Sequence, residues 1–215
     1  MGNTQKGEEV IEKYRRLTLM VPRFWLSHFL LGRAYVEMGE PNRAIEAFSK
    51  SMNLNPLSPK LYDWRAQAYR NLNDLSLAVA DNRTANGLSP DPERYARGGV
   101  DLFVLGQFEE SIQEFDQAID IYDLKIDYLV HYRKLDVAAK LNLDLALAHN
   151  NRGSVYHEAG DIEKAIDDYS EAVLINPNLG EAFFNRGMAF ALMDKIAEAK
   201  QDFLHAENLG VRIPN

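Results

Sequence analysis

The feature that most constrains the fold of this chain is an internal repeat. Three stretches align with one another: LLGRAYVEMGEPNRAIEAFSKSMNLNP ending at Pro56, NRGSVYHEAGDIEKAIDDYSEAVLINP ending at Pro177, and NRGMAFALMDKIAEAKQDFLHAENLGV ending at Val211. Each contains a small residue, an aromatic residue three positions later, an alanine nine positions after that, and a second aromatic residue four positions further on. A fixed period of this kind is the sequence signature of a solenoid built from short structural units.

Two independent markers define the same register. The second aromatic residue or its equivalent recurs at Tyr14, Phe48, Asn82, Phe115, Tyr169 and Phe203, and the successive spacings are 34, 34, 33, 54 and 34. The small residue recurs at Gly32, Ala66, Gly99, Gly153 and Gly187, and the successive spacings are 34, 33, 54 and 34. Because the two series agree, both markers belong to one repeating unit with a single basic period.

These residues resemble the tetratricopeptide repeat, a unit of two antiparallel helices, A and B. The resemblance places repeats at 25–58, 59–92, 92–125, 146–179 and 180–213, about four fifths of the chain. It implies an all-α, right-handed solenoid of five antiparallel helix pairs, forming a single array over residues 1–215, with helix A of each repeat lining a concave side. Pro56, Pro90 and Pro177 are expected to end helix B, because proline lacks a backbone donor and clashes with the preceding turn.

The chain departs from the repeat in three places. Residues 8–22 match helix B alone, which predicts an orphan N-terminal helix. The one long spacing contains an insertion at 126–145, and no Gly or Pro occurs from Gln107 through Arg152. We expect helix B of repeat three and helix A of repeat four each to gain about 10 residues, or ~15 Å; a disordered loop is the alternative, disfavoured by the apolar content. The chain stops after the last helix B without the usual polar capping helix, which favours a fragment of a longer repeat protein over ends covered by a partner.

Composition narrows the function classes. The absence of cysteine excludes disulfides, thiol catalysis and cysteine-ligated metals. No stretch reaches the ~18 apolar residues of a membrane span, and the N-terminus lacks the pattern of a secretory signal, so we expect a cytoplasmic protein. The net charge is −8, and residues 105–215 carry 10 Lys/Arg against 20 Asp/Glu. An acidic chain argues against nucleic acid as the main partner, because phosphate neutralisation supplies most of that affinity.

Motifs of catalysis are missing from the sequence. It contains no GxSxG elbow, no GxxxxGK[ST] phosphate loop and no HExxH zinc helix. His149 and His157 lie eight positions apart, about 12 Å along a helix, which is too far for a shared metal. His149 occupies a repeat position that usually packs between helices, so a core or half-buried role is expected. We therefore predict no enzyme, no metal and no cofactor.

A charged pattern links the two helices of a repeat. Where the seventh repeat position is Arg, the twenty-third is Asp, which pairs Arg65 with Asp81, Arg152 with Asp168, and Arg186 with Asp202. Antiparallel helices bring these positions together, so we expect a guanidinium–carboxylate pair bridging helix A to helix B.

The concave groove that the resemblance implies is the expected binding surface. The predicted ligand-binding residues face that groove and are Arg33, Lys60, Trp64, Gln67, Arg70, Asn71, Arg97, Asn150, Asn151, Ser154 and Asn185. A surface of Trp, Arg and Asn has the composition of a protein-binding site. The chaperone carboxylate clamp of some relatives is not predicted, since only Arg97 fits its pattern. We predict a scaffold or adaptor that binds a protein or peptide in the groove.

The alternative is an architectural segment of a longer solenoid, whose copies form a homo-oligomer through their uncapped ends. Helix B of repeat five carries Ile196, Phe203, Leu204 and Leu209 with no following helix to cover them. Uncovered apolar side chains of this kind favour association.

Overall fold

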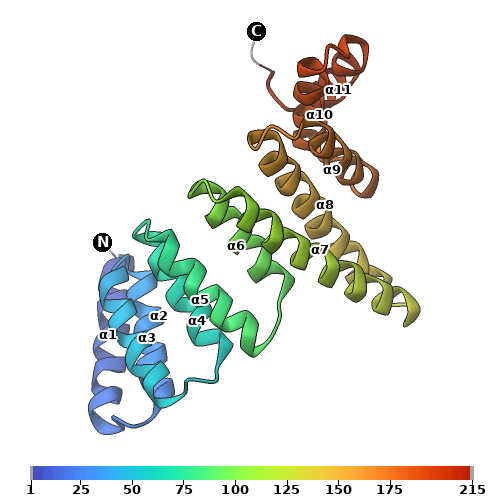
Figure 1. Cartoon of the computed structure of the whole chain (residues 1–215). Helices are drawn as coiled ribbons and strands as arrows, with labels where there is room; N and C mark the ends of the chain where they lie inside the picture. Colours follow the sequence, from blue (N-terminus) through green and yellow to red (C-terminus); the bar gives the residue numbers. More distant parts are fainter. Residues whose placement is uncertain (1, 214–215) are drawn as a thin grey trace. The chain divides into compact units, whose positions relative to one another are not determined.

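The structure is a computed structural model that describes residues 2–213, with side chains from Lys6 onward. Every regular element in this range is an α-helix (Figure 1). The helices are α1 (Gly2–Met20), α2 (Trp25–Glu37), α3 (Pro41–Leu54), α4 (Pro59–Asn71), α5 (Leu75–Leu88), α6 (Pro92–Val104), α7 (Phe108–His131), α8 (Leu135–Glu158), α9 (Ile162–Ile175), α10 (Gly180–Leu192) and α11 (Ile196–Asn208). Over the described residues, no helix has the length and apolar character needed to cross a membrane.

The predicted fold class is confirmed. The helix pairs α2/α3, α4/α5, α6/α7, α8/α9 and α10/α11 follow α1 along the chain, and the two helices of each pair pack on each other. The helix predicted at 8–22 begins earlier than expected, at Gly2, and ends at Met20. Val21 and Pro22 lie after its last turn.

Local signals account for many of the helix boundaries. Proline stands at the start of α3, α4 and α6, where its missing N–H would have no intrahelical partner. The side chain of Asp91 accepts a hydrogen bond from the Arg94 N–H at 3.0 Å and so caps α6. A residue with positive φ stands two positions after the last residue of each helix A, which allows the chain to reverse into helix B. These residues are Gly39, Asn73, Gly106, Gly160 and Asp194.

The chain divides into two compact units, Met1–Pro90 and Asp91–Asn215. In the first unit, helices α1 to α5 pack each on the next along the chain. In the second unit, helices α6 to α11 do the same. The repeat boundaries and the single array over 1–215 stay predictions.

Four of the five A/B pairs close around a glycine that faces a ring. A Cβ atom added to Gly32 would lie 2.5 Å from the Phe48 ring, so no larger side chain fits there without movement. The same arrangement joins Gly99 to Phe115, Gly153 to Tyr169, and Gly187 to Phe203. Phe48, Phe115 and Tyr169 are buried. The two sequence markers of the repeat are therefore the two sides of one contact.

Helices α7 and α8 have 24 residues each, whereas α2 to α6 and α9 to α11 have 13 or 14. The residues assigned to an insertion, 126–145, form the last turns of α7, the turn at 132–134 and the first turns of α8. Their place in the second unit is visible in Figure 1, where the chain colour passes from yellow-green to yellow.

Candidate functional site

The residues predicted to bind a ligand fall in both compact units. In the first unit they are Arg33 from α2, and Lys60, Trp64, Gln67, Arg70 and Asn71 from α4. In the second unit they are Arg97 from α6, Asn150, Asn151 and Ser154 from α8, and Asn185 from α10. Within each unit the structure brings a subset of them together.

In the first unit, Arg33, Lys60 and Trp64 gather around Phe29. The Trp64 ring meets Phe29 edge-on, with centroids 6.3 Å apart and an interplanar angle of 77°. The Arg33 guanidinium carbon lies 4.8 Å from the Trp64 centroid, and Lys60 Nζ lies 5.7 Å from the Phe29 centroid. Cations over aromatic faces at this distance are attracted by the ring quadrupole. The cluster therefore combines a rigid apolar surface with two positive charges.

The charge of Arg33 is only lightly engaged by its neighbours. Its Nη2 atom lies 3.7 Å from Glu37 Oε1, an exposed pair on the same helix that contributes little energy. Its Nε atom is buried and has no hydrogen-bond partner within the described part of the chain. The charge of Arg33 therefore remains largely unneutralised, while its Nε atom is enclosed by the protein.

Gln67, Arg70 and Asn71 lie further along α4 than Trp64. Gln67 Nε2 donates to Asn71 Oδ1 at 3.0 Å, and both side chains are exposed. Arg70 is half-buried. Gln67 and Asn71 therefore restrain each other on the exposed side of α4.

In the second unit, three asparagines form a hydrogen-bonded chain across α8 and α10. Asn185 Nδ2 donates to Asn150 Oδ1 at 3.0 Å, and Asn150 Nδ2 donates to Asn151 Oδ1 at 3.3 Å. Ser154 Oγ donates to the Asn150 carbonyl at 3.1 Å, and the Tyr169 hydroxyl lies 3.4 Å from Ser154 Oγ. Asn151 and Asn185 are half-buried and each keeps amide capacity for a ligand, because an amide group offers both donors and an acceptor.

Arg97 stands apart from this group. It is exposed on α6, and its Nη1 lies 3.4 Å from Glu93 Oε2 one turn earlier. A surface pair of this kind constrains the side chain weakly. The structure does not bring Arg97 to the asparagines of α8.

Two residues outside the predicted set complete these groups. Phe29 is the buried ring around which the cluster of the first unit is built. His157 lies on α8 near Ser154, and its Nε2 is buried without a hydrogen-bond partner among the described residues. Both occupy groove-facing repeat positions, which is the sequence signal that identifies them.

The three predicted Arg–Asp pairs are confirmed, and each is bidentate. In the first pair, Arg65 Nε lies 2.8 Å from Asp81 Oδ2, and Arg65 Nη2 lies 2.7 Å from Asp81 Oδ1. The equivalent distances are 2.8 and 2.7 Å for Arg152–Asp168, and 2.7 and 2.8 Å for Arg186–Asp202. These arginines hold helix A to helix B and are not groove residues.

Each arginine also contacts the preceding helix B with its third nitrogen. Arg65 Nη1 donates to Ser49 Oγ at 3.0 Å. Arg152 Nη1 donates to Asp116 Oδ1 at 2.5 Å, and Arg186 Nη1 donates to Ser170 Oγ at 3.2 Å. One guanidinium therefore ties three helices, two within a repeat and one from the repeat before it. The sequence offset is 36 for the Asp116 contact and 16 for the other two, and the difference matches the length of the insertion.

Asp168 receives a second partner from α8. His149 Nδ1 lies 2.9 Å from Asp168 Oδ1, and both side chains are buried. Burial alone would raise the pKa of Asp168, but the bonds from Arg152 and His149 outweigh it and hold this pKa below its ordinary value. His149 is thus a core histidine, as predicted. Across the described residues, no cluster of three His, Asp or Glu side chains is arranged to hold a metal ion.

Family models match two segments of the chain. One tetratricopeptide repeat model matches residues 146–179 and a second matches residues 27–56. These segments contain Gly153 facing Tyr169 and Gly32 facing Phe48, the contacts that define the helix pair. The chain is a tetratricopeptide repeat protein.

Relatives of this tetratricopeptide repeat protein cover it only in part. RNA polymerase II-associated protein 3 of Rattus norvegicus is 26% identical over 187 residues, which is 74% of this chain and 28% of the relative. Small glutamine-rich tetratricopeptide repeat-containing protein 2 of Mycosarcoma maydis is 30% identical over 79 residues, covering 36% of this chain and 22% of the relative. The chain therefore spans about a quarter of the length of these curated relatives.

Solved structures share the fold. The crystal structure of the MamA protein superposes with a TM-score of 0.71 at 19% identity, covering 89% of this chain and 98% of that one. The structure of YrrB, described as a TPR protein with an unusual peptide-binding site, gives 0.70 at 14% identity and covers 93% of both chains.

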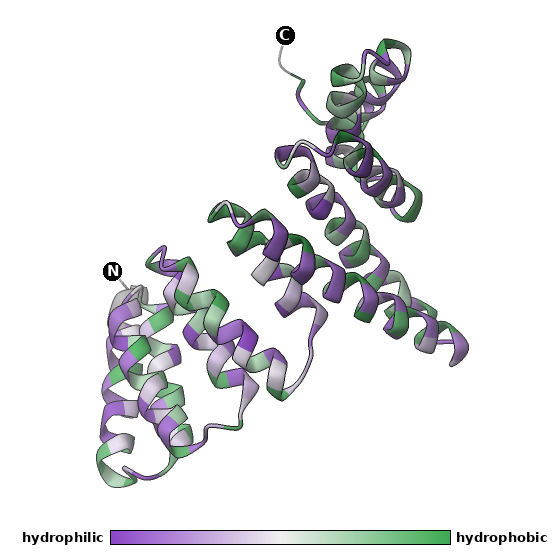
Figure 2. Cartoon of the chain, viewed as in Figure 1, coloured by the Kyte–Doolittle hydropathy of each residue, from purple (hydrophilic) through white to green (hydrophobic). Residues whose placement is uncertain are grey.

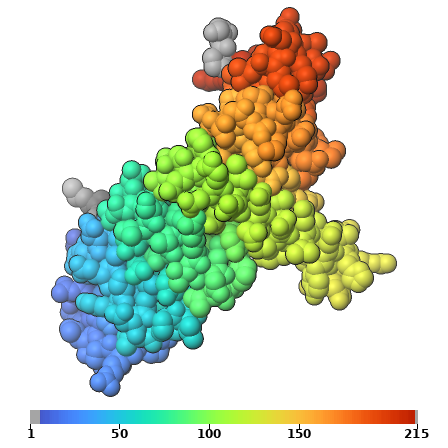
Figure 3. Space-filling view, in the orientation of Figure 1, coloured from blue at the N-terminus to red at the C-terminus, as the bar shows by residue number. Residues whose placement is uncertain are grey.

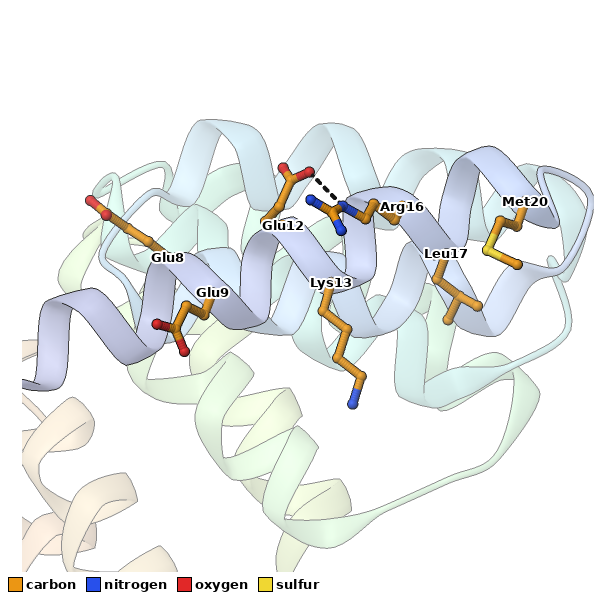
Figure 4. A pocket seen from close by; sticks show the side chains of 7 residues that line it. All are labelled: Glu8, Glu9, Glu12, Lys13, Arg16, Leu17 and Met20. Atoms are coloured by element: carbon orange, nitrogen blue, oxygen red, sulfur yellow. Dashed lines mark hydrogen bonds and ion pairs between the residues drawn. The ribbon is translucent and has the colours of Figure 1, made fainter.

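The outer surface of α1 is a separate feature of the first unit. Glu8, Glu9, Glu12, Lys13, Arg16, Leu17 and Met20 line an open depression on this single helix (Figure 4). Arg16 Nε lies 3.0 Å from Glu12 Oε1 there. Ile11 is buried, because α1 packs on α2.

Proposed function

We propose that this tetratricopeptide repeat protein is a scaffold or adaptor that binds segments of other proteins on its helix A faces. The observation that carries the proposal is the Arg33–Lys60–Trp64 cluster. Side chains of two successive helices A, α2 and α4, converge there on one aromatic surface and bring two positive charges to it.

The chemistry of the cluster defines its ligand. Trp and Arg dominate the energetics of protein interfaces, because they bury large areas and form directional hydrogen bonds. An apolar side chain packed on Trp64 and flanked by carboxylates would meet Arg33 and Lys60. We infer a peptide segment with an apolar anchor next to acidic residues.

The asparagine chain of the second unit suits a different part of a peptide. Asn151 and Asn185 are half-buried, and hydrogen bonding to Asn150 restricts their orientation. Fixed amide groups can pair with the N–H and C=O groups of an extended backbone, whatever its side chains. This surface would supply affinity with little sequence selectivity.

We also propose that the protein acts by binding and not by catalysis. Its partner is protein and not nucleic acid, and it works in the cytoplasm. The acidic net charge of −8 supports the preference against nucleic acid.

The architectural alternative is not favoured. YrrB, which shares the fold, is described as having a peptide-binding site. Self-association through the ends stays a testable part of the alternative, since Ile196, Leu204 and Leu209 are exposed on or next to α11. Sedimentation velocity of the chain alone at tens of micromolar would measure it.

Quantitative affinity capture from lysate tests the scaffold proposal. The Arg33→Gln/Lys60→Gln variant removes the charges of the first unit and keeps Trp64, whereas Asn151→Ala/Asn185→Ala removes the amides of the second. Lys50→Ala/Lys200→Ala is the control, because both lysines are exposed on helices B. We expect each groove variant to lose the proteins captured by the wild type about tenfold, and the control to retain them. Equal capture by all variants would contradict the proposal.

A further inference from the structure

The extra turns of α7 and α8 form a helical hairpin within the second unit, which we call the distal hairpin (residues 121–143). The tip of this hairpin is the yellow segment that projects in Figure 3. Tyr122 and Ala138 are buried in it, and Ile126, Leu129 and Leu141 are half-buried. A two-helix layer covers only one face of each helix, so apolar side chains remain outside.

Those side chains line a groove of about 330 Å³ on the α7 side of the hairpin. Ile121, Leu124, Lys125, Tyr128, Leu129 and Leu141 form its walls, and Lys125 is the one charged residue in that set. Leu124 is 71% exposed and Tyr128 is 59% exposed. The Tyr128 ring contacts the Tyr132 ring, and the two ring centroids lie 4.6 Å apart. Figure 2 shows green bands alternating with purple along this part of α7.

Acidic side chains run along one edge of the apolar stripe. Residues three and four apart are neighbours on a helix surface. Asp120 and Asp127 therefore border Leu124 on one side, while Ile121 and Tyr128 border it on the other. Asp123 lies one turn from both carboxylates, and all three aspartates are exposed.

The environment of Asp123 shows that this edge is not neutralised. Partial loss of hydration raises the pKa of Asp123 above its ordinary value; Asp127, Asp120 and Glu171 of α9 raise it further, and His149 of α8 lowers it. Carboxylates that repel one another gain from an added cation. No positive side chain of the hairpin lies on this edge. Lys125 lies on the opposite side of the apolar stripe, Lys140 on α8, and Arg133 and Lys134 in the turn.

We propose that the distal hairpin docks an amphipathic helix of a partner protein, with apolar side chains in the Leu124–Tyr128 groove and Lys or Arg along the Asp120–Asp127 edge. This is a second interaction surface, since none of its residues belongs to the groups around Trp64 or Asn150. An apolar helix face placed in an apolar groove is a common mode of peptide recognition. The net charge of −8 opposes a second copy of this chain as the occupant.

A designed peptide tests the proposal with the full chain. The probe is a stapled, fluorescein-labelled helix of about 16 residues, enough to span the exposed part of α7 at 1.5 Å per residue. It carries Leu on one face and Lys along one edge of that face, and a matched peptide carries Glu in place of Lys. Fluorescence anisotropy at low and at physiological salt measures the binding of each.

Two surface variants and two matched controls accompany the wild type. Leu124→Asp should weaken binding of the Lys-edged peptide by about tenfold or more, because the variant loses the exposed leucine that the bound peptide would bury. Asp120→Asn/Asp127→Asn should weaken it about threefold at low salt and reduce its salt dependence. Leu174→Asp and Glu163→Gln/Asp167→Asn make the same changes on α9, where Leu174 is 73% exposed, and should leave binding unchanged. Circular dichroism checks that every variant is folded.

Three outcomes would overturn the proposal. The Glu-edged peptide could bind as tightly as the Lys-edged one, which would remove the role of the acidic edge. Leu124→Asp could bind the peptide as well as Leu174→Asp does, which would place the site elsewhere. Sedimentation could show a wild-type dimer that Leu124→Asp dissociates, which would identify a second copy as the occupant.

Discussion

Asn82 stands where the other repeats of the structure carry a ring. It is 1% exposed, and neither its amide oxygen nor its amide nitrogen has a hydrogen-bond partner in the described part of the chain. Asn82 lies on α5, which packs on α4, the helix that carries Ala66. In the pairs Gly32–Phe48 and Gly153–Tyr169, a glycine takes the position of Ala66 and a ring takes the position of Asn82. A buried amide without partners loses its hydration and gains no bond in return.

Replacing this amide with an apolar side chain of similar size should stabilise the first unit. We expect Asn82→Leu to raise the free energy of unfolding by about 1–3 kcal/mol, the desolvation cost of an unsatisfied buried polar group. Urea denaturation followed by circular dichroism measures the change. The exposed Asn53 provides a control, since Asn53→Leu should have little effect. A loss of stability in Asn82→Leu would show that the amide has a partner or that the site cannot hold the new shape.

The Arg152–Asp168–His149 group should make stability depend on pH. The pKa of Asp168 is lower in the folded state than its ordinary value of 3.8. A depressed carboxyl pKa contributes stability above the unfolded-state pKa, and that contribution is lost as pH falls through the folded-state pKa. Asp168→Asn should therefore cost about 2–3 kcal/mol at pH 7, the value of hydrogen bonds to a charged group.

The cost of Asp168→Asn should begin to shrink below the unfolded-state pKa of about 3.8, because the unfolded wild type then takes up a proton before the folded state does. The cost should vanish as the pH falls through the lower folded-state pKa. Urea denaturation at pH 7, about pH 4 and about pH 2.5 measures this trend. Asp167→Asn is the matched control on the neighbouring, exposed position and should change little at any pH. A cost that is constant across this range would show that the ionised form of Asp168 is not what stabilises the fold.

At the scale of the helices, the turn of the distal hairpin resembles the turns between helices A and B. A residue with positive φ follows each of these helices by two positions, and glycine takes that position at Gly39, Gly106 and Gly160. The distal hairpin uses Arg133 there, with φ of 56°. For a residue with a Cβ atom, the left-handed region costs about 1–2 kcal/mol.

Arg133→Gly should relieve this strain and stabilise the hairpin. Glycine also gains freedom in the unfolded chain, so we expect a net increase of about 0.5–1 kcal/mol in the local free energy of opening. Hydrogen exchange of the amides in residues 126–145 measures it, and the amides of α2 and α3 provide the reference. Faster exchange in the variant would mean that the Arg133 side chain contributes more than its backbone conformation costs.

At the scale of the whole molecule, the chain divides at Pro90 and Asp91 into two compact units. The boundary falls where the marker spacing drops to 33 and two prolines, Pro90 and Pro92, stand close together. In a repeat protein, stability is a sum of contributions from each repeat and from contacts with its neighbours. A unit with several consecutive repeats can therefore hold its own fold.

We expect residues 91–215, produced alone, to fold cooperatively. Helices α6 to α11 pack on one another in sequence order, and the asparagine chain and two of the three Arg–Asp pairs lie within this unit. A single thermal transition by circular dichroism, with dispersed amide signals in the NMR spectrum, would agree with this expectation. A fragment without a cooperative transition would show that the two units depend on each other.

The sequence by itself determined the helix pairs and much of their internal chemistry. The two helices of each repeat pack in the same way, so the same residue types recur at the same positions. A glycine recurs opposite a ring in four repeats, and Arg recurs with Asp at a constant offset of 16 in three. Such regularities can be read from one chain, because the repeats act as an internal alignment. The lengthening of α7 and α8 follows from the same register, since the inserted residues at 126–145 are rich in helix formers and extend the two adjoining helices.

Only the tertiary structure decided which groove-facing side chains engage one another. The sequence placed Asn151 and Asn185 on one face, but it could not show that both are linked through the buried Asn150. It also predicted one carboxylate for Arg152, whereas the structure adds a second from α7, Asp116. Partner choice among flexible polar side chains depends on distances of a few tenths of an ångström between different helices. A periodic pattern specifies which face a residue lies on, and packing between helices then selects the atoms that meet.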